Sequence, residues 1–246
     1  MTFQIKNSVT SPYHFVVEGN IGVGKSTFVK LMQAQLGFHG VFEPCNRWQE
    51  VGGAGNLLEQ FYTNPTRWAY TFQTYAFVTR ILEHKEQAQR STSPVHLLER
   101  SVFSDRYVFA KYCFELGYMN TLEWKLYQEW FAWLVDTYMT KPTGFIYLRT
   151  TPEICMARMA LRNRHEEQQV PRSYIEGIHE KHEGWLIRQE GIMATMKDIP
   201  VLVLACDKDF EKDVSVQQEH AHKVQEFVNT YTGIKTHVHR QVSLTL

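Results

Sequence analysis

The stretch GNIGVGKST, from Gly19 to Thr27, has the spacing of a loop that holds nucleotide phosphates. In the pattern Gly-x-x-x-x-Gly-Lys-Ser, backbone N–H groups close around the phosphates, the lysine neutralises the outer ones and the serine can ligate Mg²⁺. A plain glycine turn is the alternative, but YHFVVE before it and FVKLMQAQL after it supply the required strand and helix. We therefore expect bound ATP or a related nucleotide. The expected phosphate contacts are Gly19, Asn20, Ile21, Gly22, Val23, Gly24, Lys25, Ser26 and Thr27.

Two glutamates lie near the ends of two short apolar stretches, the second and third predicted strands of the chain. Glu43 precedes Pro44, and Glu99 begins the sequence Glu99-Arg100-Ser101. A GTPase would carry Asp-x-x-Gly and Asn-Lys-x-Asp motifs, and neither occurs in the sequence. Because the carboxyl ends of parallel strands open onto one crevice, we expect both glutamates and the arginine to face the terminal phosphate.

Five short apolar runs are typical of strands, because they are rich in β-branched or aromatic residues and are bounded by turn residues. They are YHFVVEG (13–19), GVFEP (40–44), HLLERS (96–101), GFIYLRT (144–150) and PVLVLAC (200–206). Helical spacing between them predicts an α/β fold, with a parallel sheet between helices. No linker or repeat divides the chain, so we expect one domain over 1–246, with the ends, about 1–12 and 232–246, the least ordered.

One helical stretch, 120–139, carries apolar residues that recur at intervals of three and four and so share a face. They are Leu122, Leu126, Trp130, Trp133 and Leu134. The face is either part of the core or a subunit interface, and the spacing alone leaves both interpretations open.

The overall composition excludes several classes of protein. Lysine plus arginine and aspartate plus glutamate number 26 each, so the chain has no general basic character and we expect no nucleic-acid partner. The four cysteines lack metal-ligand or redox spacing, which is typical of reduced core thiols. The first twelve residues resemble neither a secretory signal nor a transit peptide, and no apolar run approaches membrane-spanning length. We expect a cytoplasmic protein with no membrane partner.

Several ordered stretches resemble the deoxycytidine and deoxyguanosine kinase branch of the cellular deoxynucleoside kinases. They are EGNIGVGKST, EPCNRW, FYTNPTRWAYTFQTYAF, ERSVFSDRYVFA, MNTLEWKLYQEW, IYLRTTPEICMARMALRNRHEEQ and KHEGWL. The resemblance implies a P-loop NTPase fold with a helical lid and a role in nucleotide salvage. It also implies Mg²⁺-dependent transfer of the γ-phosphate of ATP to the 5′-hydroxyl of a deoxyribonucleoside.

The resemblance assigns catalytic roles to three residues. It places Glu43 at the 5′-hydroxyl, Glu99 near Mg²⁺, and Arg100 against both the hydroxyl and the phosphoryl group. A glutamate titrates at about pH 4.3, so Glu43 would accept a hydrogen bond from the hydroxyl without unusual tuning. Glu99 is the second candidate for general base. Spacing alone also allows a turn-capping Glu43 and a local ion pair of Glu99 with Arg100.

Donor binding is assigned to two further segments. Arg158 and Arg162 lie four apart on a predicted helix, with Arg164 just beyond, and the resemblance makes them the lid over ATP. A solvated basic face is the alternative. In DKDF, Asp209 and Phe210 match the loop that contacts adenine, whereas Lys208 replaces the usual acidic residue of the family. That departure leaves ATP and UTP both open as donors.

Acceptor binding is assigned to another set by the same resemblance. Tyr62 and Glu167 would hold the sugar 3′-hydroxyl, and Gln73 would read the base edge. Trp48 and Phe109 would be aromatic walls. An aspartate beside the base accepts from an exocyclic amino group, which cytosine and adenine have and thymine lacks. The pair that carries this discrimination is Arg80 and Asp105, so we expect deoxycytidine and purine deoxynucleosides as substrates and poor turnover of thymidine.

Two other functions remain as alternatives. A nucleoside monophosphate kinase of the same architecture would need basic residues for an acceptor phosphate, where the chain offers Glu43, Tyr62, Gln73 and Glu167. A nucleotide sensor without activity would have no use for an acceptor site. The resemblance of MNTLEWKLYQEW to a family interface helix also implies a homodimer.

Overall fold

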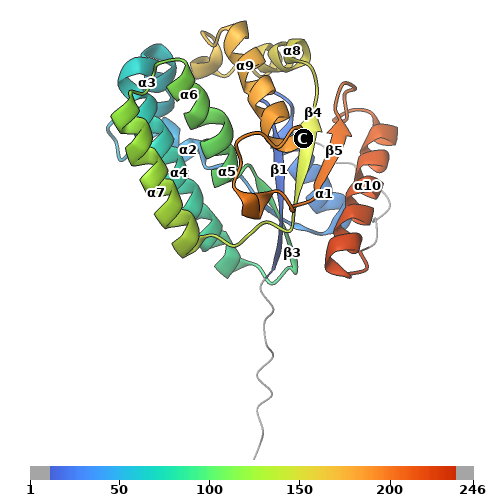
Figure 1. Ribbon diagram of the computed structural model, residues 1–246. Helices are drawn as coiled ribbons and strands as arrows, with labels where there is room; N and C mark the ends of the chain where they lie inside the picture. The colour runs from blue at the N-terminus through green and yellow to red at the C-terminus, as the bar shows by residue number, and fades with distance from the viewer. Residues whose placement is uncertain (1–11, 237–246) are drawn as a thin grey trace, which may run out of the picture.

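Figure 1 shows a computed structural model of the chain, which describes residues 12–236 apart from the side chains of Ala88 and Gln89. Five parallel strands form one sheet in the order β2-β3-β1-β4-β5, which confirms the predicted α/β class. The strands are β1 (Tyr13–Gly19), β2 (His39–Val41), β3 (Val95–Glu99), β4 (Gly144–Arg149) and β5 (Val201–Ala205).

Helices cover both faces of the sheet (Figure 1). Phe227 of α10 packs on Phe15 of β1, while His182 of α9 stacks on Tyr147 of β4 from the opposite side. The helices are α1 (Lys25–Leu36), α2 (Cys45–Gln49), α3 (Leu57–Thr63), α4 (Pro65–Arg90), α5 (Val102–Ser104), α6 (Lys111–Glu115), α7 (Thr121–Tyr138), α8 (Pro152–Arg162), α9 (Arg172–His182) and α10 (Val214–Thr232). Shorter turns are the π-helices η1 (Asp105–Ala110) and η3 (Glu183–Ile187), and the 3₁₀ turns η2 (His165–Glu167) and η4 (Ala194–Met196). The tails expected to be least ordered lie outside the described residues, apart from Pro12 and 232–236.

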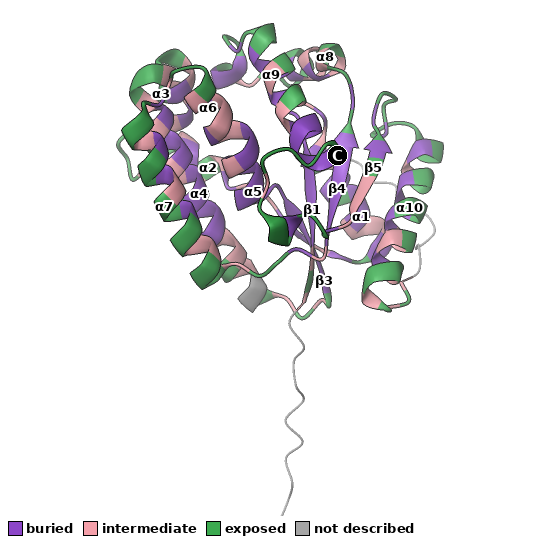
Figure 2. Cartoon of the chain, viewed as in Figure 1, coloured by how far each residue is buried: buried purple, intermediate pink, exposed green. Residues whose placement is uncertain are grey.

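The centre of the sheet is buried, as the colours of Figure 2 show. All five residues of β3 are buried, and this strand lies between β1 and β2 in the sheet. Parallel strands with both faces covered are expected to be almost wholly apolar. Three buried residues depart from that rule: Glu18 near the end of β1, and His96 and Glu99 in β3. Such groups need a specific partner or a specific use.

Histidines form a row across three neighbouring strands. His96 lies in register with His14 of β1 on one side and with His39 of β2 on the other. The ring centroids are 5.6 Å and 4.8 Å apart, respectively. Burial and the neighbouring histidines lower the pKa of His96 to about 4, and burial with Arg80 nearby lowers that of His84 on α4 to about 3. The rings of His96 and His84 are therefore neutral at physiological pH.

Acid is expected to destabilise the protein through these histidines. An unfolded histidine titrates near pH 6.5, so below that pH the unfolded chain binds more protons than the folded chain. Stability should therefore fall from about pH 6.5 to about pH 4, by up to about 1.4 kcal/mol per pH unit for each such histidine. Urea midpoints at pH 7, 6 and 5 measure the slope. His96→Gln, which cannot titrate, should flatten the slope, and an unchanged slope would exclude His96 as a source.

Helix α7 presents most of the predicted apolar face to solvent, although Leu134 is partly buried and packs against the core. Its buried residues are instead Trp124, Tyr127 and Phe131. Leu122 is 68% exposed and Trp133 is 53% exposed. Within a single chain most of the predicted face is therefore not core.

Within residues 12–236 no helix combines the length and the apolar character needed to cross a membrane.

Candidate active site

The phosphate loop connects β1 to α1 at the carboxyl end of the sheet. Gly22 (φ 81°) and Gly24 (φ 103°) have left-handed backbones, and a Cβ on Gly24 would lie 2.7 Å from the ring of Phe210. Only glycine fits these two positions without strain. Lys25 folds back over the loop, with Nζ 2.8 Å from the carbonyl oxygen of Asn20. The loop borders a cavity of about 1060 Å³, which is large enough for a nucleotide and a second substrate.

Lys25 is 6% exposed and has arginines for neighbours. Burial and the charge of Arg100 lower the pKa of Lys25 to about 7, although Glu43 and Glu99 act in the opposite direction. Without a ligand, the ammonium form is therefore only partly populated at neutral pH. A bound polyphosphate would favour the charged form.

ATP binding is therefore expected to take up a proton above pH 7, and its affinity should fall between pH 7 and pH 9. Calorimetry in two buffers that differ in ionisation enthalpy measures this uptake. Lys25→Arg is the matched control, because arginine keeps its charge throughout this range. Binding enthalpies of the wild type that do not depend on the buffer would contradict the expected titration of Lys25.

Ser26 and Glu99 form the pair that could hold a metal ion. Ser26 Oγ donates to Glu99 Oε1 at 2.7 Å, and the backbone N–H of Glu43 lies 3.4 Å from Glu99 Oε2. Adjacent ligands of octahedral Mg²⁺, each about 2.1 Å from the ion, are about 3 Å apart. The two oxygens therefore fit neighbouring ligand positions. Within the described part of the chain, no group of three or more His, Cys, Asp or Glu could hold a metal.

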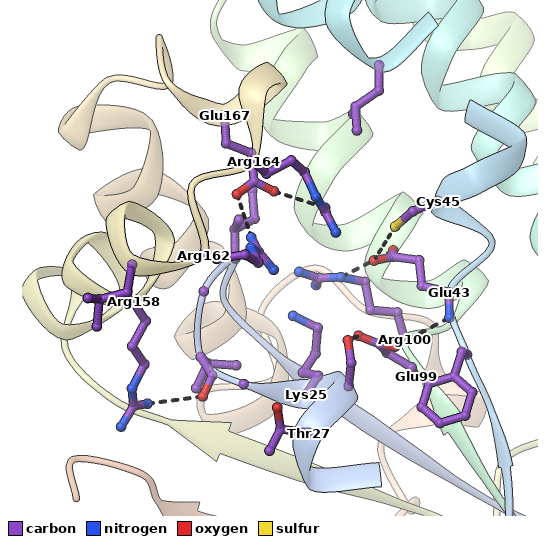
Figure 3. Close-up of a pocket in the computed structure, with 18 of the residues that line it drawn as sticks. Lys25, Thr27, Glu43, Cys45, Glu99, Arg100, Arg158, Arg162, Arg164 and Glu167 are labelled. Atoms are coloured by element: carbon purple, nitrogen blue, oxygen red, sulfur yellow. Dashed lines mark hydrogen bonds and ion pairs between the residues drawn. The ribbon is translucent and has the colours of Figure 1, made fainter. Parts of the chain in front are cut away.

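A buried ion-pair network lies beside this pair, and Figure 3 shows part of it. Arg80 binds both oxygens of Asp105, at 2.9 and 3.1 Å, and donates to Glu43 Oε1 at 2.8 Å. Arg100 Nε lies 3.4 Å from the same Glu43 oxygen. Glu43 Oε2 is approached only by the Cys45 thiol, at 3.7 Å, among the residues that the structure describes. One oxygen of Glu43 is thus held in place while the other remains available to a ligand.

Neighbouring positive charges determine the ionisation state of Glu43. Burial disfavours its ionised form, but Arg80, Arg100 and Lys25 outweigh burial and lower the pKa to about 2. Glu43 is therefore a carboxylate at any physiological pH. The ionised carboxylate accepts hydrogen bonds, but with so low a pKa it is a weak base, so it can receive the proton of an alcohol only as that alcohol loses electron density.

The arginines predicted as a lid are held in two different ways. Arg158 donates to the carbonyl oxygens of Val23, Cys206 and Lys208, and so ties α8 to the phosphate loop and to the loop after β5. Arg162 and Arg164 instead form ion pairs with Glu167, as Figure 3 shows. All three arginines line the cavity. Arg158 is a structural clamp in this state, whereas the other two would be freed if Glu167 bound a sugar hydroxyl.

The predicted acceptor residues converge on the same cavity. Trp48, Tyr62, Gln73, Phe109 and Glu167 all line it. The guanidinium of Arg100 stacks over the ring of Phe109 at 4.6 Å. The structure thus brings the phosphate loop and the predicted acceptor residues, far apart in sequence, to one site.

Asp105 is the informative exception. Three predicted site residues do not line the cavity: Asp105, and Gly19 and Asn20 of the phosphate loop. The Asp105 side chain is buried, with Asp105 only 2% exposed. Arg80 lies between its carboxylate and Glu43 and does reach the cavity. The pair is therefore present as predicted, with Arg80 as the member that the cavity presents.

Several residues at the site have no counterpart in the sequence predictions. Glu18 binds Ser101 beneath the site, and Cys45 reaches Glu43. Lys30 of α1 and Asp207 after β5 line the cavity. Lys30 follows Ser26 by one helical turn, and Asp207 follows a strand end, so helical period and strand position were signals that could have identified both.

Comparison with known proteins gives a consistent result. Residues 15–229 match the family model described as deoxynucleoside kinase. The chain is 40% identical over 227 residues to deoxycytidine kinase 2 of Gallus gallus, covering 83% of this chain and 85% of the relative. It is 38% identical over 233 residues to the mitochondrial deoxyguanosine kinase of Xenopus laevis, covering 86% and 88%. It is also 38% identical over 237 residues to the deoxycytidine kinase of Mus musculus, covering 87% and 90%.

Proposed function

The chain belongs to the deoxynucleoside kinase family, and on this basis we propose that it transfers the γ-phosphate of ATP to the 5′-hydroxyl of a deoxyribonucleoside. One observation carries the proposal: four arginines that line the cavity already pair with carboxylates. The pairs are Arg80 and Arg100 with Glu43, and Arg162 and Arg164 with Glu167. An acceptor phosphate would need unpaired cations, whereas a sugar needs the hydrogen-bond acceptors that these carboxylates provide.

In this proposal the chain positions two substrates and neutralises the transferring charge. The loop residues and Lys25 hold the triphosphate, and Ser26 and Glu99 hold Mg²⁺, which neutralises phosphate charge. Glu43 accepts the hydrogen bond of the 5′-hydroxyl through its available oxygen, and Arg100 stabilises the phosphoryl group as it moves. Phosphoryl transfer through a loose transition state relies mainly on such positioning and electrostatics. The roles of Arg162 and Arg164 over the phosphates belong to the same proposal.

We propose deoxycytidine and purine deoxynucleosides as acceptors, with thymidine poor. Gln73 presents one donor and one acceptor to the base. Arg80 occupies only part of the capacity of the Asp105 carboxylate, since its two oxygens offer about four lone-pair sites. An amino group of the base can share these sites after a small shift of Arg80, whereas thymine offers a carbonyl and a methyl group to them.

Initial phosphorylation rates with ATP and Mg²⁺ test this proposal. The acceptors are deoxycytidine, deoxyadenosine, deoxyguanosine, thymidine and deoxycytidine monophosphate. Turnover of the first three with weak thymidine turnover supports the proposal. Strong thymidine turnover would remove the specificity argument, turnover of the monophosphate alone would indicate a nucleoside monophosphate kinase, and hydrolysis of ATP without any acceptor dependence would favour a nucleotide sensor. UTP in place of ATP tests donor choice.

We propose further that the protein is a homodimer joined through α7. Leu122, Trp130 and Trp133 are 68%, 46% and 53% exposed in the single chain, and contiguous apolar patches of this kind mark interfaces. A cytoplasmic location is part of the proposal, and fluorescence microscopy of a tagged chain tests it.

The dimer is expected to have about twice the 28.9 kDa mass of the chain in light scattering. Trp130→Glu with Trp133→Glu should yield a folded monomer, because two charges would then oppose each other across the interface. Val214→Glu, an equally exposed apolar position on α10, is the matched control and should stay dimeric. A monomeric wild type at micromolar concentration would contradict the proposal.

A further inference from the structure

Arg100 has an unusual backbone for a buried arginine. Its φ is 64°, and the other non-glycine residues with positive φ among the described residues are Asn163 and Gln189. Asn163 ends a helix, and Gln189 is exposed, whereas Arg100 is 3% exposed. A left-handed backbone is strained for a non-glycine residue, so it persists only where neighbouring contacts impose it.

Two consecutive residues of β1 impose this conformation. The N–H of Arg100 donates to the carbonyl oxygen of Val17 at 3.0 Å. Ser101 Oγ donates to Glu18 Oε1 at 2.7 Å. The Ser101 hydroxyl also accepts from the N–H groups of Phe103 and Ser104, as the N-cap of α5. Its single proton is therefore committed to Glu18.

Glu18 is held by the Ser101 hydroxyl, and the hydroxyl of Ser104 and the charge of Arg100 also act on its carboxyl group. It is 0% exposed, and its Oε2 has no hydrogen-bond partner among the described residues. A buried carboxyl group is costly, so its presence in a central strand requires a benefit elsewhere. The contact with Ser101 is the benefit that the geometry shows.

The anchored segment carries the groups that surround the acceptor carboxylate. Arg100 lies immediately before Ser101 and reaches Glu43 Oε1 at 3.4 Å. The π-helix η1, which follows α5, begins with Asp105, and Asp105 holds Arg80 against the same oxygen. A shift of Ser101 would therefore displace both arginines around Glu43.

We propose that Glu18 is a positioning residue, whose hydrogen bond with Ser101 holds Arg100 in the left-handed conformation that directs it to Glu43. The inference rests on the proposed kinase function, because it assigns Arg100 to the transferring phosphoryl group. Glu18 touches neither substrate, and its effect on turnover passes through the segment Glu99-Arg100-Ser101.

The ionisation of Glu18 is consistent with a role in geometry. Burial raises the pKa of Glu18 to about 7, although the charge of Arg100 and the hydrogen bond from Ser101 oppose the shift. Near neutral pH the carboxyl is thus ionised only in part. A neutral side chain of the same shape, with a carbonyl oxygen in place of Oε1, should fulfil the same role.

Glu18→Gln and Glu18→Leu test the proposal as a matched pair. Glutamine keeps the acceptor for Ser101, and leucine removes it with little change in volume. We expect Glu18→Leu to lower kcat for deoxycytidine at least tenfold per folded molecule, with the Kd of ATP within threefold of wild type. Glu18→Gln should retain kcat within threefold. Ser101→Ala, which removes the donor instead, should lower kcat like Glu18→Leu and serves if the leucine variant does not fold.

A readout independent of activity separates this inference from the proposed function. The ¹⁵Nε–Hε resonance of Arg100, assigned with Arg100→Lys, should shift in Glu18→Leu and Ser101→Ala and stay in place in Glu18→Gln. An unmoved resonance in Glu18→Leu, or equal losses of kcat in both Glu18 variants, would overturn the positioning role. A wild type inactive on every deoxynucleoside would overturn the kinase proposal, while the resonance would still report on the role of Glu18.

Discussion

Glu43→Gln is expected to lower turnover of deoxycytidine at least about a hundredfold, which is typical for loss of a general base and corresponds to about 2.7 kcal/mol. Glutamine keeps the size of the side chain and can still accept from Arg80. It lacks the charge that receives the 5′-hydroxyl proton, and it leaves Arg80 and Arg100 less well neutralised. Steady-state kcat at saturating ATP measures the effect. Because the pKa of Glu43 is about 2, the wild-type profile should show no inflection from this group above about pH 4.

Glu99→Gln is the matched control, because it makes the same change at the other carboxylate of the site. The Glu99 carboxylate pairs with Ser26, whereas the Glu43 carboxylate pairs with Arg80. This variant should raise the Mg²⁺ concentration needed for half-maximal rate, whereas Glu43→Gln should leave that concentration unchanged. Near wild-type turnover in Glu43→Gln would indicate that Glu99, and not Glu43, is the general base.

Arg80→Leu combined with Asp105→Ala is expected to raise thymidine turnover relative to deoxycytidine turnover by at least about tenfold. Removing both charges together leaves neither one buried without its partner, and the wall facing the base becomes apolar. Turnover of every substrate should fall, since Arg80 also binds Glu43 at 2.8 Å. The ratio of the two kcat/KM values is therefore the relevant measure.

The single variant Arg80→Leu provides the control for this experiment. Arg80→Leu leaves Asp105, which is 2% exposed, without a counter-ion, and breaking such a pair costs about 3–5 kcal/mol. Its urea midpoint should lie below that of the double variant. An unchanged kcat/KM ratio in the double variant would show that the pair does not read the base.

The phosphate loop and the five strands could be predicted because their signals are local. Gly24 must be glycine for its own backbone conformation, and Lys25 and Ser26 follow it at a spacing that the loop dictates. Strand ends after apolar runs likewise place Glu43 and Glu99 on one edge of the sheet. The second strand ends at Val41, earlier than the predicted Pro44, because Glu43 turns toward Glu99 and leaves the ladder.

Other features depend on which surfaces meet. The spacing of Leu122, Trp130 and Trp133 predicted a shared apolar face but not that the opposite face, with Tyr127, would be the buried one. Helix α7 carries apolar residues on two opposite faces, so helical period alone cannot select the core face. Packing against α4, α5, η1 and α6 makes that choice.

By itself, the sequence determined the fold class, the nucleotide loop and the types of residue at the site, because these follow from periodicity and from motifs within one segment. Apart from the expected pair of Arg80 with Asp105, the tertiary structure alone decided the pairing of charges. Arg80 on α4 lies between Glu43 and Asp105, and Glu18 in β1 anchors Ser101 after β3. Partners in these contacts are 25 to 83 residues apart, and electrostatic energy depends on distance and burial in space, which no local pattern of residues encodes.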